Sequence, residues 1–149
     1  MSAAEVCPIS GLTRIILATD GSEHSEKALV EAVSLAKACG TMLSAVTVVE
    51  TNPEYAALAP KAIEKAEAEA KEFLDAVKEC AAKEDVQVQT VVLHGQDVAT
   101  VLVEHAKKAD ADMIVMGRHG KKKGLKKLFM GSVTSSLISH APCKVLVVP

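Results

Sequence analysis

Short apolar runs alternate with longer amphipathic stretches along the whole chain. Five of the runs have the length and the β-branched composition of buried strands, and turn residues such as Gly, Asp and Pro follow several of them. The stretches between them repeat their apolar residues at helical spacing. The five predicted strands are Thr13–Thr19, Thr41–Glu50, Val86–Leu93, Ala111–Met116 and Cys143–Val148.

Four helices are predicted between these strands. The clearest is Lys61–Lys83, where one stripe is apolar and the glutamates lie mostly off it, which is typical of a helix that covers one face of a sheet. Ser22 and Asp97 are candidate N-caps, and Gly40 is placed to end the first helix. Thr51–Pro60 holds two prolines and is predicted to be a loop. The other helices are predicted at Ser22–Cys39, Val98–Lys107 and Ser132–Ala141.

The order βαβαβαβαβ predicts an α/β fold, in which a doubly wound parallel sheet carries helices on both faces. These elements fill the chain, so we expect a single domain over residues 1–149, with residues 1–12 as a flexible N-terminal extension. Ligands of such sheets bind outside the carboxyl ends of the strands. The candidate segments are therefore Thr19–Ser22, Val48–Thr51, His94–Asp97 and Gly117–Gly120.

Glycines mark the most informative of these strand ends. Gly117 and Gly120 leave the fourth predicted strand, and Gly131-Ser132 opens the last predicted helix. Glycine lets the backbone approach a ligand closely, and a helix start offers unpaired N–H groups to a phosphate. Together these residues indicate a phosphate cradle. A glycine turn followed by an ordinary Ser-capped helix is the alternative that the residues leave open.

Charge is divided unevenly along the chain. Residues 113–149 hold seven Lys and Arg and no Asp or Glu, whereas residues 1–112 hold ten against 19, so a net charge of −2 conceals segments of +7 and −9. The split indicates an anionic ligand or partner, with a solvated basic loop as the alternative. Only three aromatic residues are present, too few for the stacking platform of a single-strand nucleic-acid binder.

Other features bear on localisation and redox state. No apolar run reaches the ~18 residues of a membrane span, and the first residues do not resemble a signal peptide. We therefore expect a cytoplasmic protein that makes no membrane contact. Its four scattered cysteines, with no C-x-x-C pair, are expected to be reduced.

At these residues the sequence resembles the universal stress protein family, over nearly the whole chain. The segments that carry the resemblance are IILATDGSEHSEKAL, AVTVVE and DMIVMGRHGKKKGLKKLFMGSVTSSLISHAPCKVLVV. The nucleotide-binding subgroup of that family carries G-2x-G-9x-G-(S/T). Gly117, Gly120 and Gly131-Ser132 match this pattern with a linker one residue longer. The extra residue is assigned to Lys121–Gly124, because the segment from Leu125 onward still matches.

The resemblance implies an adenine nucleotide alpha hydrolase-like fold of three layers, whose five-stranded parallel sheet has the order 3-2-1-4-5. It places Asp20 near the adenine and ribose, Val48 against the adenine, and Ala18 where some members have proline beside the base. Gly117 and Gly120 would wrap the ribose and phosphates. The expected phosphate-binding residues are Gly131, Ser132, Val133 and Thr134, and the predicted site also includes Thr19, Met116 and Arg118.

The implied ligand is ATP, ADP or AMP, with Mg²⁺ or Mn²⁺ held through the phosphates when a metal accompanies it. The chain itself shows no histidine pair at metal-ligand spacing. Asp20 and Ser132 are better explained as ligand contacts than as catalytic groups, so any ATP hydrolysis should be slow. The resemblance also implies a homodimer through Cys143–Val148, which the apolar, unpaired edge of the last strand favours independently.

The sequence gives weaker support to several other functions. The chain contains neither the Walker pattern G-x-x-x-x-G-K-[ST] nor the dinucleotide pattern G-x-G-x-x-G. A receiver domain would need two acidic residues after the first strand and one after the third, where this chain has Asp20 alone and Leu93–Gly95. Two alternatives stay open: a family member without nucleotide binding, and a dimeric module that binds protein or nucleic acid through Lys121–Lys127.

Overall fold

Strands and helices alternate along the chain in the order that the apolar pattern predicts. The computed structural model describes residues 12–118 and 131–149. The elements are β1 (Ile15–Ala18), α2 (Glu23–Cys39), β2 (Leu43–Glu50), α3 (Pro53–Leu58), α4 (Pro60–Ala82), β3 (Val88–Gly95), α5 (Val98–Lys108), β4 (Met113–Gly117), α6 (Ser132–His140) and β5 (Lys144–Val148).

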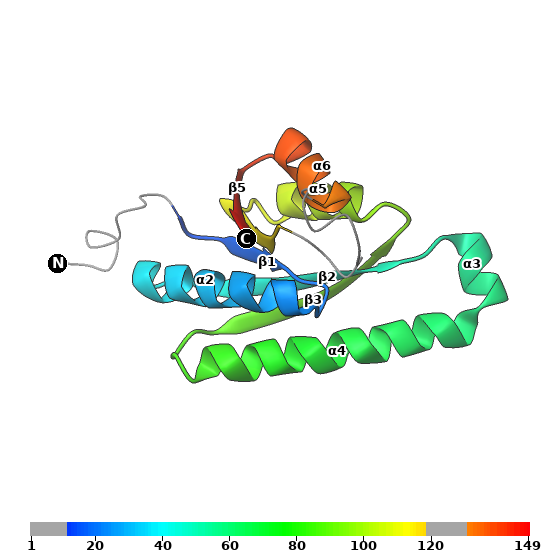
Figure 1. Ribbon diagram of the computed structural model, residues 1–149, viewed down its shortest axis with the longest axis horizontal. Coiled ribbons are helices and arrows are strands. Elements are labelled where there is room, and N and C mark those ends of the chain that lie inside the picture. Colours follow the sequence, from blue (N-terminus) through cyan, green and yellow to red (C-terminus); the bar gives the residue numbers. More distant parts are fainter. Residues whose placement is uncertain (1–11, 119–130) are drawn as a thin grey trace.

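The strands form one parallel five-stranded sheet in the order β3-β2-β1-β4-β5. Helices α2 and α4 cover one face of this sheet, and α5 and α6 cover the other (Figure 1). The predicted three-layer, doubly wound fold and its strand order are therefore confirmed.

Each face of the sheet packs its own apolar core, and β1 contributes to both. Ile15 and Leu17 join the core beneath α2 and α4, whereas Ile16 joins the core beneath α5 and α6. Successive side chains of a strand point to opposite faces, so a central strand that is covered on both sides must be apolar throughout. This explains why IILA reads as a continuous apolar run.

The segment after β2 differs from the prediction. Thr51–Pro60 was expected to be a loop, but Pro53–Leu58 forms α3. The side chain of Asn52 caps this helix, because its Oδ1 accepts a hydrogen bond from the backbone N–H of Tyr55 at 2.8 Å. Pro53 occupies the first turn, where proline lacks only an N–H group that would have no partner in the helix. The two prolines begin helices here and do not interrupt one.

The three predicted cap residues all occupy cap positions. Asp97 accepts a hydrogen bond from the N–H of Thr100 at 3.2 Å, and Gly40 ends α2 with a φ of 64°. Ser22 is the N-cap residue of α2, as predicted, but its hydroxyl makes no capping hydrogen bond. The N–H of Ser25 donates to the carbonyl of Ser22 at 3.0 Å. The side chain of Asp20 accepts from the N–H of Ser22 at 2.9 Å.

Three further expectations concern the termini, the cysteines and the membrane. Cys80 and Cys143 are free thiols, but Cys39 is disulfide-bonded, so the expectation of four reduced cysteines is wrong there. Spacing along the sequence carried no signal of that bond. Leu12 is buried in the core beneath α2 and α4, and residues 1–11 of the predicted extension lie outside the described residues. No helix in the described part of the chain is long and apolar enough to cross a membrane.

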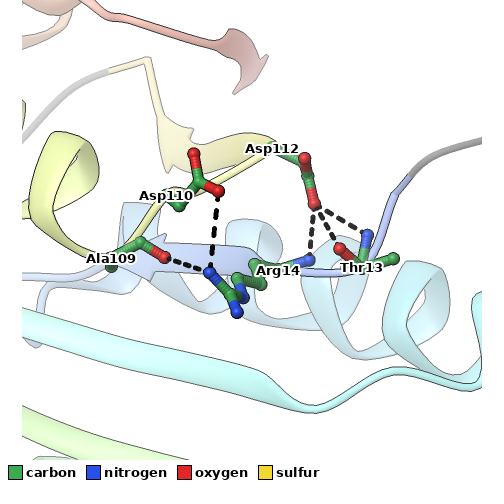
Figure 2. A network of polar contacts seen from close by, with 5 residues as sticks. All are labelled: Thr13, Arg14, Ala109, Asp110 and Asp112. Carbon is green, nitrogen blue, oxygen red and sulfur yellow. Dashed lines mark hydrogen bonds and ion pairs between the residues drawn. The ribbon is translucent and has the colours of Figure 1, made fainter.

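At the amino-terminal edge of the sheet, one carboxylate ties together the entries to β1 and β4. Asp112 Oδ2 accepts hydrogen bonds from the N–H and the hydroxyl of Thr13 and from the N–H of Arg14, each at 2.8 Å (Figure 2). These donors hold the pKa of Asp112 below its ordinary value. The neighbouring ion pair between Arg14 and Asp110, at 3.8 Å, is exposed and contributes little.

We therefore expect Asp112→Ala to lower the free energy of unfolding at pH 7 by about 1–2 kcal/mol, because it removes three hydrogen bonds to an ionised acceptor in a partly exposed place. A carboxyl group whose pKa is lower in the folded state than in the unfolded state stabilises the fold at pH values above its unfolded pKa of about 4. This stabilisation is lost as the pH falls through the folded-state pKa. The difference in the free energy of unfolding between the wild type and Asp112→Ala should therefore become smaller as the pH is lowered.

Urea unfolding of the wild type and Asp112→Ala at pH 7 and pH 3 measures this. Asp110→Asn is the control; it removes the exposed ion pair, keeps a residue that tolerates the positive φ of 53°, and should change stability by less than about 0.5 kcal/mol. Equal deficits for Asp112→Ala at both pH values would contradict the assignment.

Candidate functional site

A notch at the carboxyl edge of the sheet arises from the unequal lengths of neighbouring strands. In the register of the parallel pairs, Ala18 at the end of β1 stands beside Val46 of β2 and Met116 of β4. Strand β2 then continues to Glu50, four residues beyond that level, whereas β1 stops. The space above Ala18 is therefore flanked by β2 on one side and by the end of β4 on the other.

This notch is part of a cleft of about 520 Å³, which is a usual size for a small-molecule site. Residues from α4 line one side of the cleft, and residues from α5 and α6 line the other. Ten predicted site residues are brought together in its walls, namely Ala18, Thr19, Asp20, Val48, Met116, Gly117, Gly131, Ser132, Val133 and Thr134. Arg118 is exposed and does not line it, and Gly120 lies outside the described residues.

The turn after β1 is closed by its own side chains. The N–H of Thr19 donates to the carbonyl of Val46 at 3.0 Å, which extends the pairing with β2. Asp20 then accepts from Ser22 as described above, and the N–H of Gly21 donates to the hydroxyl of Thr19 at 3.3 Å. These bonds fix the carboxylate of Asp20 at the wall of the cleft.

Gly21 is required in this turn for two reasons. Its φ is +77°, a conformation that residues with a side chain rarely adopt. A Cβ built on it would also lie 2.7 Å from Cδ1 of Phe73, a half-buried residue of α4. Phe73 therefore packs directly on the turn and links α4 to the end of β1.

Polar contacts hold the start of α6 to the end of β4. The hydroxyl of Thr134 donates to the carbonyl of Gly117 at 3.1 Å in a buried position, and the N–H of Gly131 donates to the carbonyl of Arg118 at 3.0 Å. The first residues of a helix have N–H groups without partners inside the helix. Those of Ser132, Val133 and Thr134 therefore lie beside the notch, at the positive end of the helix dipole.

The charges that line the cleft differ from those expected. Its charged lining residues in the described part of the chain are all acidic: Asp20, Glu50, Glu69 and Asp97. Among the described residues, the positive segment contributes no cationic side chain to these walls, because neither Arg118 nor Lys144 lines the cleft. The lysines of 121–127, with His119, fall outside the described residues. Attraction for an anion in the described cleft thus comes from backbone N–H groups.

Sequence reasoning missed the wall that α3 and α4 provide. Tyr55, Ile63, Ala66, Glu69 and Phe73 all line the cleft. A length comparison could have found this wall. A 23-residue helix is about 35 Å long, whereas an eight-residue strand spans about 26 Å, so α4 must overhang the sheet. Its buried residues accordingly begin only at Ala70.

The described residues of the cleft can be compared with the arrangements that bind metal ions. Among the residues that the structure describes, no group of three or more His, Cys, Asp or Glu is arranged to hold an ion. The carboxylates of Asp20 and Asp97 are each engaged by a backbone N–H, of Ser22 and Thr100 respectively.

Solved structures share this fold. The UspA universal stress protein of Lactobacillus plantarum superposes with a TM-score of 0.84 and 25% identity, over 95% of this chain and all of that one. Two others are 23% identical: a universal stress protein in complex with cAMP, with a TM-score of 0.70 over 93% of this chain and 98% of that one, and one from Archaeoglobus fulgidus in complex with dAMP, with a TM-score of 0.69 over 92% and 98%.

Sequence comparison agrees with the fold. The model of the universal stress protein family matches residues 11–149. A universal stress protein of Methanocaldococcus jannaschii is 37% identical over 139 residues, which cover 91% of this chain and 81% of that protein. The chain therefore belongs to the universal stress protein family.

Proposed function

We propose that this chain binds an adenine nucleotide, ATP, ADP or AMP, in the cleft at the carboxyl ends of β1, β2 and β4. The observation that carries the proposal is the start of α6, whose unpartnered N–H groups are held beside the notch by the bonds from Thr134 and Gly131. A helix N-terminus in this setting suits a phosphate group. Apolar residues close by offer a place for a base.

The predicted residues that line the cleft each have a role in the proposal. The phosphate accepts hydrogen bonds from the N–H groups of Ser132 and Val133. Gly131 leaves room for it without a side chain, because its own N–H donates to the carbonyl of Arg118. Thr134 acts through the carbonyl of Gly117. The carboxylate of Asp20 accepts a hydrogen bond from a ribose hydroxyl, as carboxylates do in other nucleotide sites. The residues that face the base or the sugar from the strand ends are Ala18, Thr19, Val48, Met116 and Gly117.

The choice of an adenine nucleotide as the ligand is supported by proteins with the same fold. Structures with the same architecture contain cAMP and dAMP, both adenine nucleotides with one phosphate group. Because a shared fold is weaker support than a matched site, the proposal for this chain rests on its own cleft. Any Mg²⁺ or Mn²⁺ would be held by phosphate oxygens and water. We further propose that the protein acts as a nucleotide-dependent regulator, with catalysis secondary or absent.

Isothermal calorimetry with ATP, ADP and AMP should show saturable binding at physiological salt. Gly131→Val should weaken it by at least tenfold, because its side chain intrudes where a phosphate would accept backbone hydrogen bonds, each worth about 1.5–3 kcal/mol when charge-assisted. The φ of −61° and ψ of 153° at Gly131 suit any residue, so the variant should fold.

Gly131→Ala, which adds a single methyl group, should show an intermediate loss of affinity. Circular dichroism melting of both variants checks that they remain folded. The absence of heat for the wild type at millimolar nucleotide would refute the proposed function.

We also propose a homodimer through the edge of β5. This strand pairs with β4 on one side only, and its residues Val145–Val148 are all partly buried apolar side chains. An exposed apolar strand edge favours pairing with another chain, and natural proteins cover such edges. A second copy of the chain is the partner that the family resemblance implies.

Light scattering should therefore give twice the chain mass of 15.6 kDa. Val147→Lys should shift the protein to monomer, because Val147 belongs to neither core cluster and a lysine opposes pairing at an edge. Val30→Lys, on the exposed side of α2, is the matched control and should leave the mass unchanged. A wild-type monomer at high concentration would count against the dimer.

A further inference from the structure

The cleft has two halves of different chemistry. One half, at the start of α6, presents backbone N–H groups. The other, along α3, α4 and the end of β2, presents aromatic and apolar side chains together with the carboxylates of Glu50 and Glu69. We propose that Tyr55 contacts the planar base of the bound nucleotide and that this half of the cleft fixes the orientation of the ligand. This inference rests on the proposed function and extends it to a residue that the family pattern does not include.

Aromatic side chains are scarce in this chain, and their placement is informative. The sequence holds one Tyr, two Phe and no Trp. Tyr55 and Phe73 are the aromatic residues that the structure describes, and both line the cleft. Phe73 is engaged with the turn at Gly21, whereas Tyr55 lines the cleft and is 45% exposed. A base that stacked on Tyr55 would bury part of its ring.

The backbone around Tyr55 is held in place even though α3 buries no residue in the core. The N–H of Thr51 donates to the carbonyl of Gly95 at 2.8 Å, which fixes the exit from β2 against the end of β3. Asn52 then accepts from the N–H of Tyr55, and the carbonyl of Tyr55 accepts from the N–H of Ala59, each at 2.8 Å. Tyr55 is thus presented at the wall by hydrogen bonds on both sides of its own residue.

Charge decides which end of the ligand occupies this half. Glu50 and Glu69 line the cleft here. Lys65 lies 4.0 Å from Glu69 in an exposed pair, but it is not a lining residue. Carboxylates repel a phosphate and accept hydrogen bonds from an amino group, whereas the start of α6 attracts a phosphate. The phosphate is therefore directed to α6 and the uncharged base toward Tyr55.

The tyrosine provides its own probe, because a chain with one Tyr and no Trp owes its near-ultraviolet emission to Tyr55. Titration with AMP should quench this emission saturably, with the same Kd that calorimetry gives. Ribose 5-phosphate has the same sugar and phosphate but no base, so it should leave the emission unchanged. N-acetyltyrosinamide at equal concentration corrects for absorption of light by the adenine.

Variants then test whether Tyr55 contacts the base. Base–aromatic stacking is worth about 1–3 kcal/mol, so Tyr55→Ala should weaken AMP binding by at least about fivefold while ribose 5-phosphate binds as before. Tyr55→Phe keeps the ring and should stay within about twofold of the wild type. Leu58→Ala is the matched control, since Leu58 lies on the same helix, is 79% exposed and does not line the cleft.

The outcomes separate the two claims. If AMP binds the wild type but neither quenches Tyr55 nor loses affinity in Tyr55→Ala, the inference is wrong and the proposed function stands. An equal loss for AMP and ribose 5-phosphate in Tyr55→Ala also overturns it, because the effect would not depend on the base. If the wild type binds no adenine nucleotide, the proposed function fails and this inference fails with it.

Discussion

The early end of β1 is the constraint on which the site depends. β1 lies between β2 and β4 at the centre of a parallel sheet, and its register aligns the carboxyl ends of all three strands at one edge. Because it stops at Ala18 while β2 continues to Glu50, it leaves a notch that the flanking helices must complete. The apolar character that buries β1 on both faces thus also places the cleft.

The two ends of this notch are built by different means. Near α6 the site is formed by backbone groups, because hydrogen bonds from the hydroxyl of Thr134 and the N–H of Gly131 to two carbonyl groups hold the helix start against β4. Near α4 the cleft is lined by side chains, because this helix extends past the edge of the sheet. Phe73 of this helix packs on the turn after β1. These two halves are the basis of our proposal that the ligand has an anionic end and a flat, uncharged end, as a nucleotide does.

Much of the fold could be predicted from the sequence, because apolar periodicity and turn residues report local structure. All five strands and four of the helices were located in this way, and Asp97 and Gly40 were identified as caps. The helix α3 was missed because prolines are read as breakers, although Pro53 lies where a helix tolerates it. The disulfide at Cys39 was missed because spacing along the chain does not reveal proximity in space.

The site was predicted less completely for a related reason. The glycines and the serine at strand and helix ends predict the half of the cleft in which we propose that a phosphate binds, and ten of the predicted residues line one cleft. The sequence predicts a loop around Tyr55, and for the first turns of α4 it predicts an apolar stripe that packs on the sheet. No local feature of the sequence shows that a helix extends past the end of a sheet. The basic segment suggested side-chain cations at the ligand, yet the described walls carry only carboxylates.

A crystal structure of the protein grown with AMP tests the account most directly. The account predicts the nucleotide in the cleft, with its phosphate within hydrogen-bond distance of the N–H groups of Ser132 and Val133 and its base against Tyr55. A nucleotide bound outside the cleft, or one whose base lies at the start of α6 with its phosphate beside Glu50 and Glu69, would contradict it.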